Sequence, residues 1–268
     1  MIIFIAAAVD ILIWRLIPFS SFDVLYIIGI AVIINYLLLK MNHWIHLMIS
    51  VMVILFTPII QMIYGYSNSP FEIMLSEENL FQNWKDGPVL KNLFIEGWFP
   101  IFPWLGLSLF GSFVGRFYIK IGIKKRQKFF GYFGALLLLL GISIWSIAQP
   151  NLITRSGYSE LFYPPTLCYI FTYCGLIFLG LTYINNINSA FLMKIFAVYG
   201  QSSLLTYVLH SLFIARFFNL HFGALSFVNF LQLYFFHAFL LWWIAKFTQL
   251  IKPELKKAPF LIRFLIGT

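Results

Sequence analysis

The feature that most constrains this chain is a series of eight hydrophobic blocks joined by short polar segments. A helix that crosses the hydrocarbon core of a bilayer needs about 20 mostly apolar residues. We place the blocks near residues 2–17, 23–39, 45–64, 100–118, 129–148, 165–183, 201–218 and 227–249. We therefore predict an all-α, polytopic membrane helix bundle with about eight transmembrane helices.

The composition excludes a soluble protein. Of the 268 residues, 61% are hydrophobic and only 10% are charged, and the mean hydropathy is +0.89. A soluble domain has about 25% charged residues. Because no polar stretch is long enough to bury a core of its own, we predict a single transmembrane domain over residues 1–268. Asp10 and Arg15 interrupt the first block, which argues against a cleaved signal peptide.

The charges sort to two sides when the blocks are threaded back and forth. One side receives Lys40, Arg116, Lys120, Lys124, Lys125, Arg126, Lys128, Lys194, Lys246, Lys252, Lys256, Lys257 and Arg263, with Glu254 as its only acid. The other receives Asp23, Glu72, Glu77, Glu78, Asp86, Glu96 and Glu160, with Arg15, Lys85, Lys91, Arg155 and Arg216. Lys and Arg collect on the cytoplasmic side of membrane proteins. Both termini are therefore predicted to be cytoplasmic, and the net charge of +9 reflects topology rather than nucleic-acid binding.

Two connecting segments carry further predictions. The long segment 65–99 faces outward, and Ser69-Pro70-Phe71-Glu72 within it has the pattern of a helix start. The segment 116–128 forms a basic cytoplasmic loop. Residues 191–199, with Lys194, are expected to form an interfacial stretch before the seventh block.

Ionisable groups inside a membrane are functional candidates by default. Asp10 lies within the first block, and we assign it equally to helix packing or to a substrate passage. His210 lies within the seventh block, where it could act as a general base. Tyr207 and Ser203 stand three and seven residues before it, so the three form one polar stripe. This stripe could line a passage, or it could be a structural hydrogen-bonded seam.

The basic segment contains one residue pair of particular interest. Arg116 follows Gly115 where the fourth block meets the interface, and a close-approach glycine beside an arginine suits a phosphate. The other basic residues are explained by topology alone. His43 and His46 have no third ligand nearby, so we interpret them as interfacial anchors and predict no metal site. Cys168 and Cys174, six residues apart, fall on different helix faces and do not indicate a disulfide.

One stretch resembles a family signature. It reads Gly97-Trp98-Phe99-Pro100-Ile101-Phe102-Pro103-Trp104-Leu105-Gly106 and is followed by Phe110-Gly111-Ser112-Phe113-Val114-Gly115-Arg116. It is similar to the Pro-x-x-Pro-Trp-Leu-Gly run and Gly-Arg helix end of bacterial membrane proteins related to heparan-α-glucosaminide N-acetyltransferase. Residues 22–31 and 199–210 resemble two further segments of that family in the same order.

The resemblance implies an enzyme that transfers an acetyl group from cytoplasmic acetyl-CoA to an amino sugar or glycan at the outer face. Arg116 and Gly115 would contact the CoA phosphate, and His210 would take the catalytic role. The setting would be the bilayer of a bacterial inner membrane. The family's opening Arg-x-x-x-Asp-x-x-Arg-Gly stretch and the histidine near it have no counterpart here, so we expect a shortened chain with little activity alone. The alternative is a non-catalytic transport or scaffold protein that retains the fold.

Overall fold

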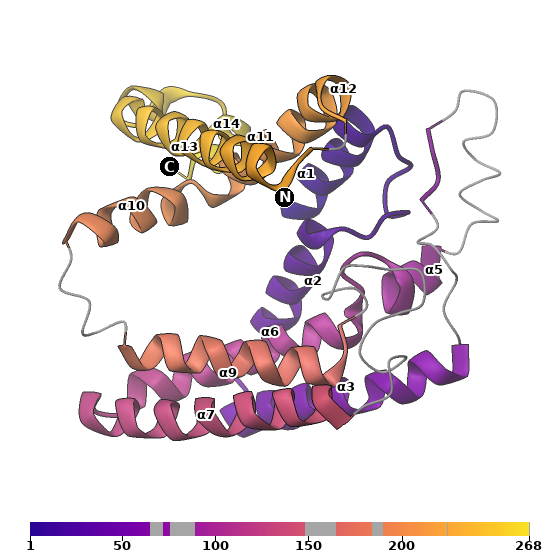
Figure 1. The fold of residues 1–268 in the computed structure, drawn as a ribbon, viewed down its shortest axis with the longest axis vertical. Coiled ribbons are helices and arrows are strands. Elements are labelled where there is room, and N and C mark those ends of the chain that lie inside the picture. The colour runs from indigo at the N-terminus through magenta and orange to yellow at the C-terminus, as the bar shows by residue number, and fades with distance from the viewer. Residues whose placement is uncertain (65–71, 76–88, 148–164, 184–189, 224, 268) are drawn as a thin grey trace. The chain divides into compact units, whose positions relative to one another are not determined.

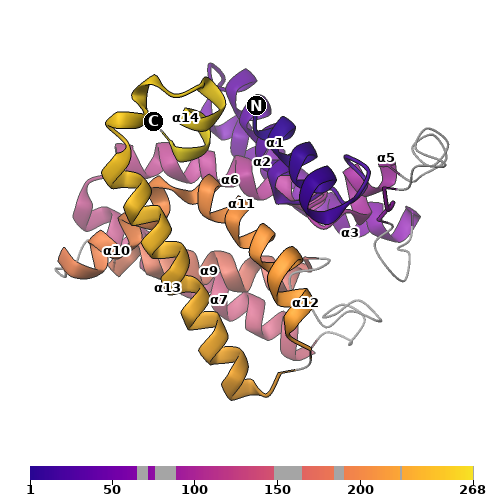
Figure 2. The same ribbon diagram turned by 90° about the horizontal axis from the view of Figure 1, so that it is seen from above.

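The computed structural model of the protein describes residues 1–64, 72–75, 89–147, 165–183, 190–223 and 225–267 (Figures 1 and 2). Within these ranges the chain is almost entirely helical, and the extended pairing is one isolated bridge between Leu16 and Met74. The predicted all-α class is confirmed. The helix start expected at Ser69–Phe71 lies outside the described residues.

Each predicted block contains a helix. The elements are α1 (Ile2–Val9), η1 (Asp10–Trp14), α2 (Val24–Leu37), α3 (His43–Tyr64), α5 (Val89–Lys91), η2 (Asn92–Glu96), α6 (Ile101–Lys120), α7 (Ile123–Ile147), α9 (Leu167–Tyr183), α10 (Ala190–Gln201), α11 (Ser203–Phe213), η4 (Ile214–Phe218), α12 (Asn219–His221), α13 (Phe227–Ile251), η5 (Glu254–Lys257) and α14 (Phe260–Ile266). The stretch predicted before the seventh block is the helix α10, and one residue, Ser202, separates it from α11.

Four helices within the described ranges are long and apolar enough to cross a membrane: His43–Tyr64, Lys124–Ile147, Ser203–His221 and Phe227–Ile251. A fifth crossing results if Val89–Glu96 and Ile101–Lys120, bent by 50°, are taken together. Three other apolar helices, Ile2–Trp14, Val24–Leu37 and Leu167–Tyr183, are shorter. The membrane bundle is therefore supported, and the count of eight spans stays a prediction.

The described chain divides into two compact units: Met1–Ile11 with Arg15–Ile187, and Leu12–Trp14 with Asn188–Thr268. In the first unit, α3 packs along α6, α7 packs along α9, and α2 contacts both α1 and α6. In the second, α13 contacts α10 and α11, and α11 also contacts α14. The single domain predicted over the whole chain stays a prediction.

Glycines allow the closest helix contacts in the first unit. A Cβ atom on Gly175 of α9 would lie 2.6 Å from the backbone nitrogen of Leu138 and 2.8 Å from the carbonyl oxygen of Gly134, both in α7. A Cβ atom on Gly106 of α6 would lie 3.0 Å from the carbonyl oxygen of Ser50 in α3. Small residues at such contacts are the usual means of packing membrane helices.

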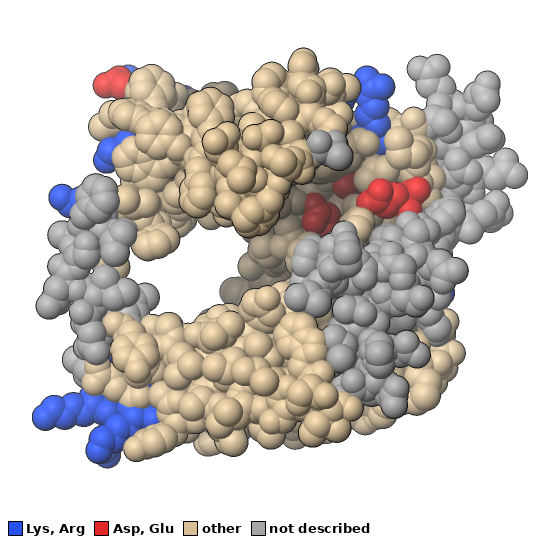
Figure 3. Space-filling model, viewed as in Figure 1, with Lys and Arg blue, Asp and Glu red and all other residues tan. Residues whose placement is uncertain are grey.

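The segment 116–128, which we predicted to be a basic cytoplasmic loop, is mostly helical. α6 continues to Lys120 and α7 begins at Ile123, so the connection is a tight turn between two basic helix ends. Figure 3 shows basic side chains gathered at this turn. We call Arg116, Lys120, Lys124, Lys125, Arg126 and Lys128 the basic turn.

Candidate functional site

Helix α6 is the central element of the first unit because three of its faces meet different surroundings. Gly106, Leu109 and Phe113 lie on the face toward α3, and all three are buried. Ser108 and Ser112 face α2, and Arg116 continues the same stripe one turn further, because residues four apart share a helix face. The third face borders a cavity shared with α9.

The α2-facing stripe contains a hydrogen-bonded polar cluster. The Asn35 side-chain amide donates to the hydroxyl oxygen of Ser108 at 3.1 Å and to the carbonyl oxygen of Ala31 at 2.8 Å. The Ser112 hydroxyl donates to the Asn35 amide oxygen. A polar cluster between two apolar helices is unusual because membrane surroundings offer its groups no other partners.

A cleft of about 710 Å³ lies between α2 and α6 and contains this cluster. Its lining on α2 begins at Val24 and continues past the end of the helix to Leu39, and Phe99 and Trp104 line it beside the start of α6. The cleft therefore follows the whole length of α2. Its volume is within the range of about 300–1,000 Å³ that is usual for small-molecule sites.

Arg116 lies at the end of the same stripe. Its guanidinium donates to the carbonyl oxygens of Leu39 at 2.9 Å and of Met41 at 3.2 Å, which follow α2 in the chain. Two of the five guanidinium N–H groups are thus used to hold the end of α2. Gly115, predicted with Arg116 as one phosphate site, instead lines the cavity on the α9 side. A Cβ atom there would meet nothing within 4 Å, so the chain itself makes no close approach.

Asp10 is held inside the first unit, with 1% of its surface exposed. Its carboxylate accepts hydrogen bonds from the Tyr26 hydroxyl at 2.6 Å and the Ser21 hydroxyl at 3.1 Å. This partnership fits the packing role that we weighed for Asp10, and its place in a substrate passage stays a prediction. A π-helical turn begins at Asp10, and the chain then reverses at Arg15 with a left-handed φ of 58°.

The signature segment packs against the loop that follows α1. The backbone N–H groups of Trp98 and Phe99 donate to the carbonyl oxygens of Ser21 and Phe22, each at 3.0 Å. Gly97 is required here because a Cβ atom would lie 2.5 Å from the Cβ of Phe22 and 2.6 Å from the carbonyl oxygen of Asn92. The first glycine of the signature therefore serves close packing beside the entrance to α6.

His210 has a partner that the sequence did not reveal. Its Nδ1 lies 3.0 Å from Nε2 of His237 on α13, within the second unit. His237 is 7% exposed, and the rings of Phe213 and Phe218 meet it edge-on. One imidazole donates to the other, so the pair can share a proton. Tyr207 and Ser203 lie on the same helix as His210, and their assignment to a passage stays a prediction.

The interpretation of His46 as an interfacial anchor is wrong, because none of its surface is exposed and it lies on the face of α3 that also buries Ser50 and Thr57. The His43 ring stacks on Phe113 and packs at a tilt against Trp44. Within the described ranges, no three His, Cys, Asp or Glu side chains are grouped to hold a metal ion. Cys168 and Cys174 are free thiols.

The sequence singled out Arg116 and His210 as candidates, and these stay predictions; it did not single out Asn35, Ser108 and Ser112. The serines carried a usable signal, since Ser108, Ser112 and Arg116 recur every four residues in an apolar helix. The pairing of that stripe with Asn35 depends on which helices are neighbours. A hydrophobicity pattern does not determine this arrangement.

Comparison with protein families gives a match over the first part of the chain. The model of the family described as "Heparan-alpha-glucosaminide N-acetyltransferase, catalytic" matches residues 1–150. The matched region contains Asp10, the α2–α6 cleft and Arg116, and it ends before His210 and His237. Neither the curated proteins nor the solved structures that were compared contain a match. Because the match covers more than half of the chain and agrees with the signature at residues 97–116, the chain belongs to the heparan-alpha-glucosaminide N-acetyltransferase catalytic family.

Proposed function

We propose that this membrane protein is an acetyltransferase that takes an acetyl group from cytoplasmic acetyl-CoA and transfers it to an amino sugar or glycan at the outer face. We place it in the cytoplasmic membrane of a bacterium. Membership in the family supports the reaction class. The observation that carries the proposal is the cleft that follows all of α2 and contains the Asn35, Ser108 and Ser112 cluster.

The chemistry of acetyl-CoA fits this cleft. The pantetheine arm is a long chain with two amide groups, so it needs a narrow site with a few hydrogen-bonding side chains in an otherwise apolar wall. Asn35, Ser108 and Ser112 supply such groups within the cleft. Arg116, one turn beyond Ser112, places a permanent positive charge at the predicted cytoplasmic end, where the CoA phosphates would remain in water.

Transfer requires the acceptor amine to attack the thioester carbonyl carbon. A C–N bond forms, the C–S bond breaks, the CoA thiolate leaves, and the amine loses a proton. A positioned base that accepts this proton contributes about 10²–10⁴-fold to the rate. We propose His210 as this base and His237 as its positioning residue, because the 3.0 Å contact fixes one ring against the other.

Binding of acetyl-CoA to the purified protein in detergent or nanodiscs tests the cofactor part of the proposal. Ser112→Val places a branched apolar side chain in the cleft, and it should abolish measurable binding. Ser146→Val is the matched control because Ser146 lies exposed on α7, outside the cleft. Equal binding by the two variants, with wild type shown to bind, would contradict the placement of acetyl-CoA between α2 and α6.

Arg116 can be tested separately from the cleft. Arg116→Ala should weaken acetyl-CoA binding by about 1.5–3 kcal/mol, the usual value of a hydrogen bond to a charged group. The variant should leave binding of acetyl-pantetheine unchanged, because that fragment has no phosphate. A loss of equal size for both ligands would show that Arg116 only holds the end of α2.

The transfer step is tested with labelled acetyl-CoA and amino-sugar acceptors. We expect little transfer by the chain alone; where the wild type does transfer acetyl groups, His210→Ala should lower that rate by about 10²–10⁴-fold with little change in acetyl-CoA affinity. His237→Leu should lower the rate as well, and His237→Gln, which retains a hydrogen-bonding side chain, should recover part of it. Wild-type binding without any transfer would favour the alternative of a non-catalytic transport or scaffold protein.

A further inference from the structure

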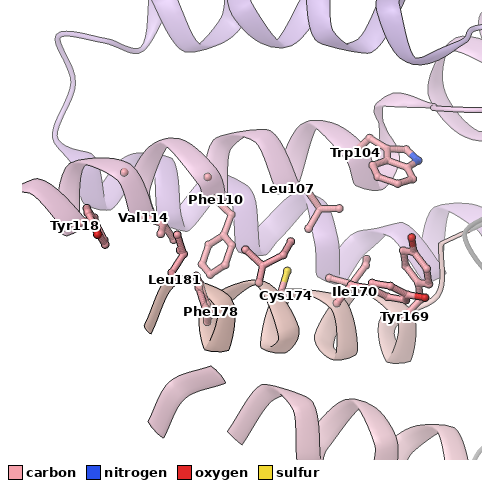
Figure 4. A pocket seen from close by; sticks show the side chains of 14 residues that line it. Trp104, Leu107, Phe110, Val114, Tyr118, Tyr169, Ile170, Cys174, Phe178 and Leu181 are labelled. Carbon is pink, nitrogen blue, oxygen red and sulfur yellow. The ribbon is translucent and has the colours of Figure 1, made fainter. Parts of the chain in front are cut away.

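A second cavity of about 640 Å³ lies between α6 and α9, beside the α2–α6 cleft, with which it shares Trp104 and Leu107 of its lining (Figure 4). Trp104 and Tyr169 stand at one end of it, and Tyr118 and Leu181 stand at the other. The side chains between them are almost all apolar. Nothing in the proposed acetyl transfer uses this cavity.

Glycines keep this cavity open. Gly111 and Gly115 lie on the α6 face that lines it, and a Cβ atom on either would meet nothing within 4 Å. The open space therefore does not serve close packing between α6 and α9. The lining extends from Trp104 to Tyr118 along α6, which is about 21 Å at 1.5 Å per residue. One leaflet of the hydrocarbon core is about 15 Å thick, so an extended acyl chain fits along the cavity.

The two ends of the cavity differ in charge. Its Tyr118 end lies at the basic turn, and the guanidinium carbon of Arg126 stands 4.1 Å from the centre of the Tyr118 ring. The Arg126 Nε donates to the carbonyl oxygen of Ile121, which fixes the side chain at the turn between α6 and α7. The acids of the first unit that the structure describes, Asp10, Asp23, Glu72 and Glu96, lie near the other end of α6.

We propose that this cavity is a binding site for an anionic phospholipid of the bilayer, with one acyl chain between α6 and α9 and the phosphate headgroup at the basic turn. A bilayer supplies both parts of this ligand. Basic pockets between membrane helices on the cytoplasmic side bind anionic headgroups, and each nearby Lys or Arg contributes about 1 kcal/mol. An apolar cavity alone would not favour one lipid over another, and the basic turn provides that preference.

The experiment compares dioleoyl phosphatidylglycerol with dioleoyl phosphatidylcholine, which have the same acyl chains, by native mass spectrometry of the purified full chain. The wild type should retain phosphatidylglycerol preferentially, and Arg126→Gln should lower that preference about fivefold, the equivalent of about 1 kcal/mol. Gly111→Leu should displace both lipids, because the added side chain would occupy the cavity. A Cβ atom at this position meets nothing within 4 Å, so the substitution should not disturb the packing of α6. Equal retention of the two lipids by the wild type would by itself overturn the proposal, whatever the variants show.

Two matched controls separate the site from general effects. Gly180→Leu adds the same side chain to α9 at a glycine that also has open space but does not line the cavity. Lys194→Gln removes one exposed positive charge from α10, which belongs to the second unit and is not part of the basic turn. Both should bind phosphatidylglycerol as the wild type does, and a loss equal to that of the test variants would overturn the assignment.

The position of the lipid is measured with phosphatidylglycerol that carries a photoreactive group on one acyl chain. Cross-links should fall on residues 104–118 and 169–181, and cross-links elsewhere would overturn the proposal.

A second copy of this chain is the competing occupant, because Gly111 and Gly115 have the four-residue spacing of helix-dimer contacts. A wild-type dimer that Gly111→Leu converts to a monomer, with no lipid preference, would replace the lipid by that partner.

Discussion

At the residue scale, the chain combines a buried carboxylate with an irregular backbone. Asp10 has two hydroxyl partners, and the loop after it contains Phe19 and Phe22 with left-handed φ values of 68° and 46°. Each such conformation costs about 1–3 kcal/mol for a residue with a side chain. Phe22 is fully buried, and its carbonyl oxygen accepts from Phe99 of the signature segment. The Asp10 contacts therefore help to hold the loop on which the entrance to α6 is built.

This arrangement makes Tyr26 a stability determinant. Its hydroxyl donates to Asp10 and accepts from the backbone N–H of Phe19 at 3.1 Å. Tyr26→Phe removes both bonds and should lower the free energy of unfolding by about 1–3 kcal/mol, as expected when buried groups lose their partners. Reversible unfolding in mixed detergent micelles measures this change. Tyr36→Phe is the control, because Tyr36 is exposed on the same helix, and an equal effect of both substitutions would contradict the role of the Asp10 contact.

At the element scale, the hydrophobic blocks predicted which segments are helices because burial in lipid depends mainly on composition. They did not predict which helices are neighbours, since the pairing of α3 with α6 and of α7 with α9 depends on surface shape. For the same reason the sequence did not predict the Asn35 cluster, whereas Arg116 could be singled out from the sequence alone. The π-helical turn at Asp10 was also missed, because it arises from contacts with Ser21 and Tyr26 that are distant in sequence.

The α7–α9 pair gives a prediction at the same scale. Gly175→Ala places a Cβ atom 2.6–2.8 Å from the α7 backbone, which cannot move aside as a flexible side chain could. The two helices must separate, and overpacking of this kind costs about 1–3 kcal/mol. The thermal midpoint of the purified protein should fall. Gly180→Ala, on the same helix with open space around it, should leave the midpoint unchanged. Equal midpoints for the two variants would show that α7 and α9 are not closely packed.

At the scale of the whole molecule, charge distribution is the property that links sequence, fold and proposed activity. In the first unit the basic turn lies at one end of α6, and the described acids lie near the other end. α6 has 20 residues, about 30 Å of helix, so the two groups are separated by the thickness of a hydrocarbon core. This separation is what the sorted charges predict. Arg116 lies at the basic end of α6, which we propose as the side from which acetyl-CoA enters.

The predicted orientation can be measured with reporter fusions. A reporter that is active only outside the cytoplasmic membrane should be active after residue 90 and silent after residues 42 and 125, because the positive charge near both of the latter positions opposes their export. A reporter that is active only in the cytoplasm should give the reverse pattern. Replacement of Lys120, Lys124 and Lys125 by Gln should weaken the cytoplasmic retention of the fusion after residue 125. The fusion after residue 42, which has Lys40 beside it, should be unaffected. Export at residue 125 in the unmodified chain would place the basic turn outside, and the proposed cytoplasmic entry of acetyl-CoA at Arg116 would then be wrong.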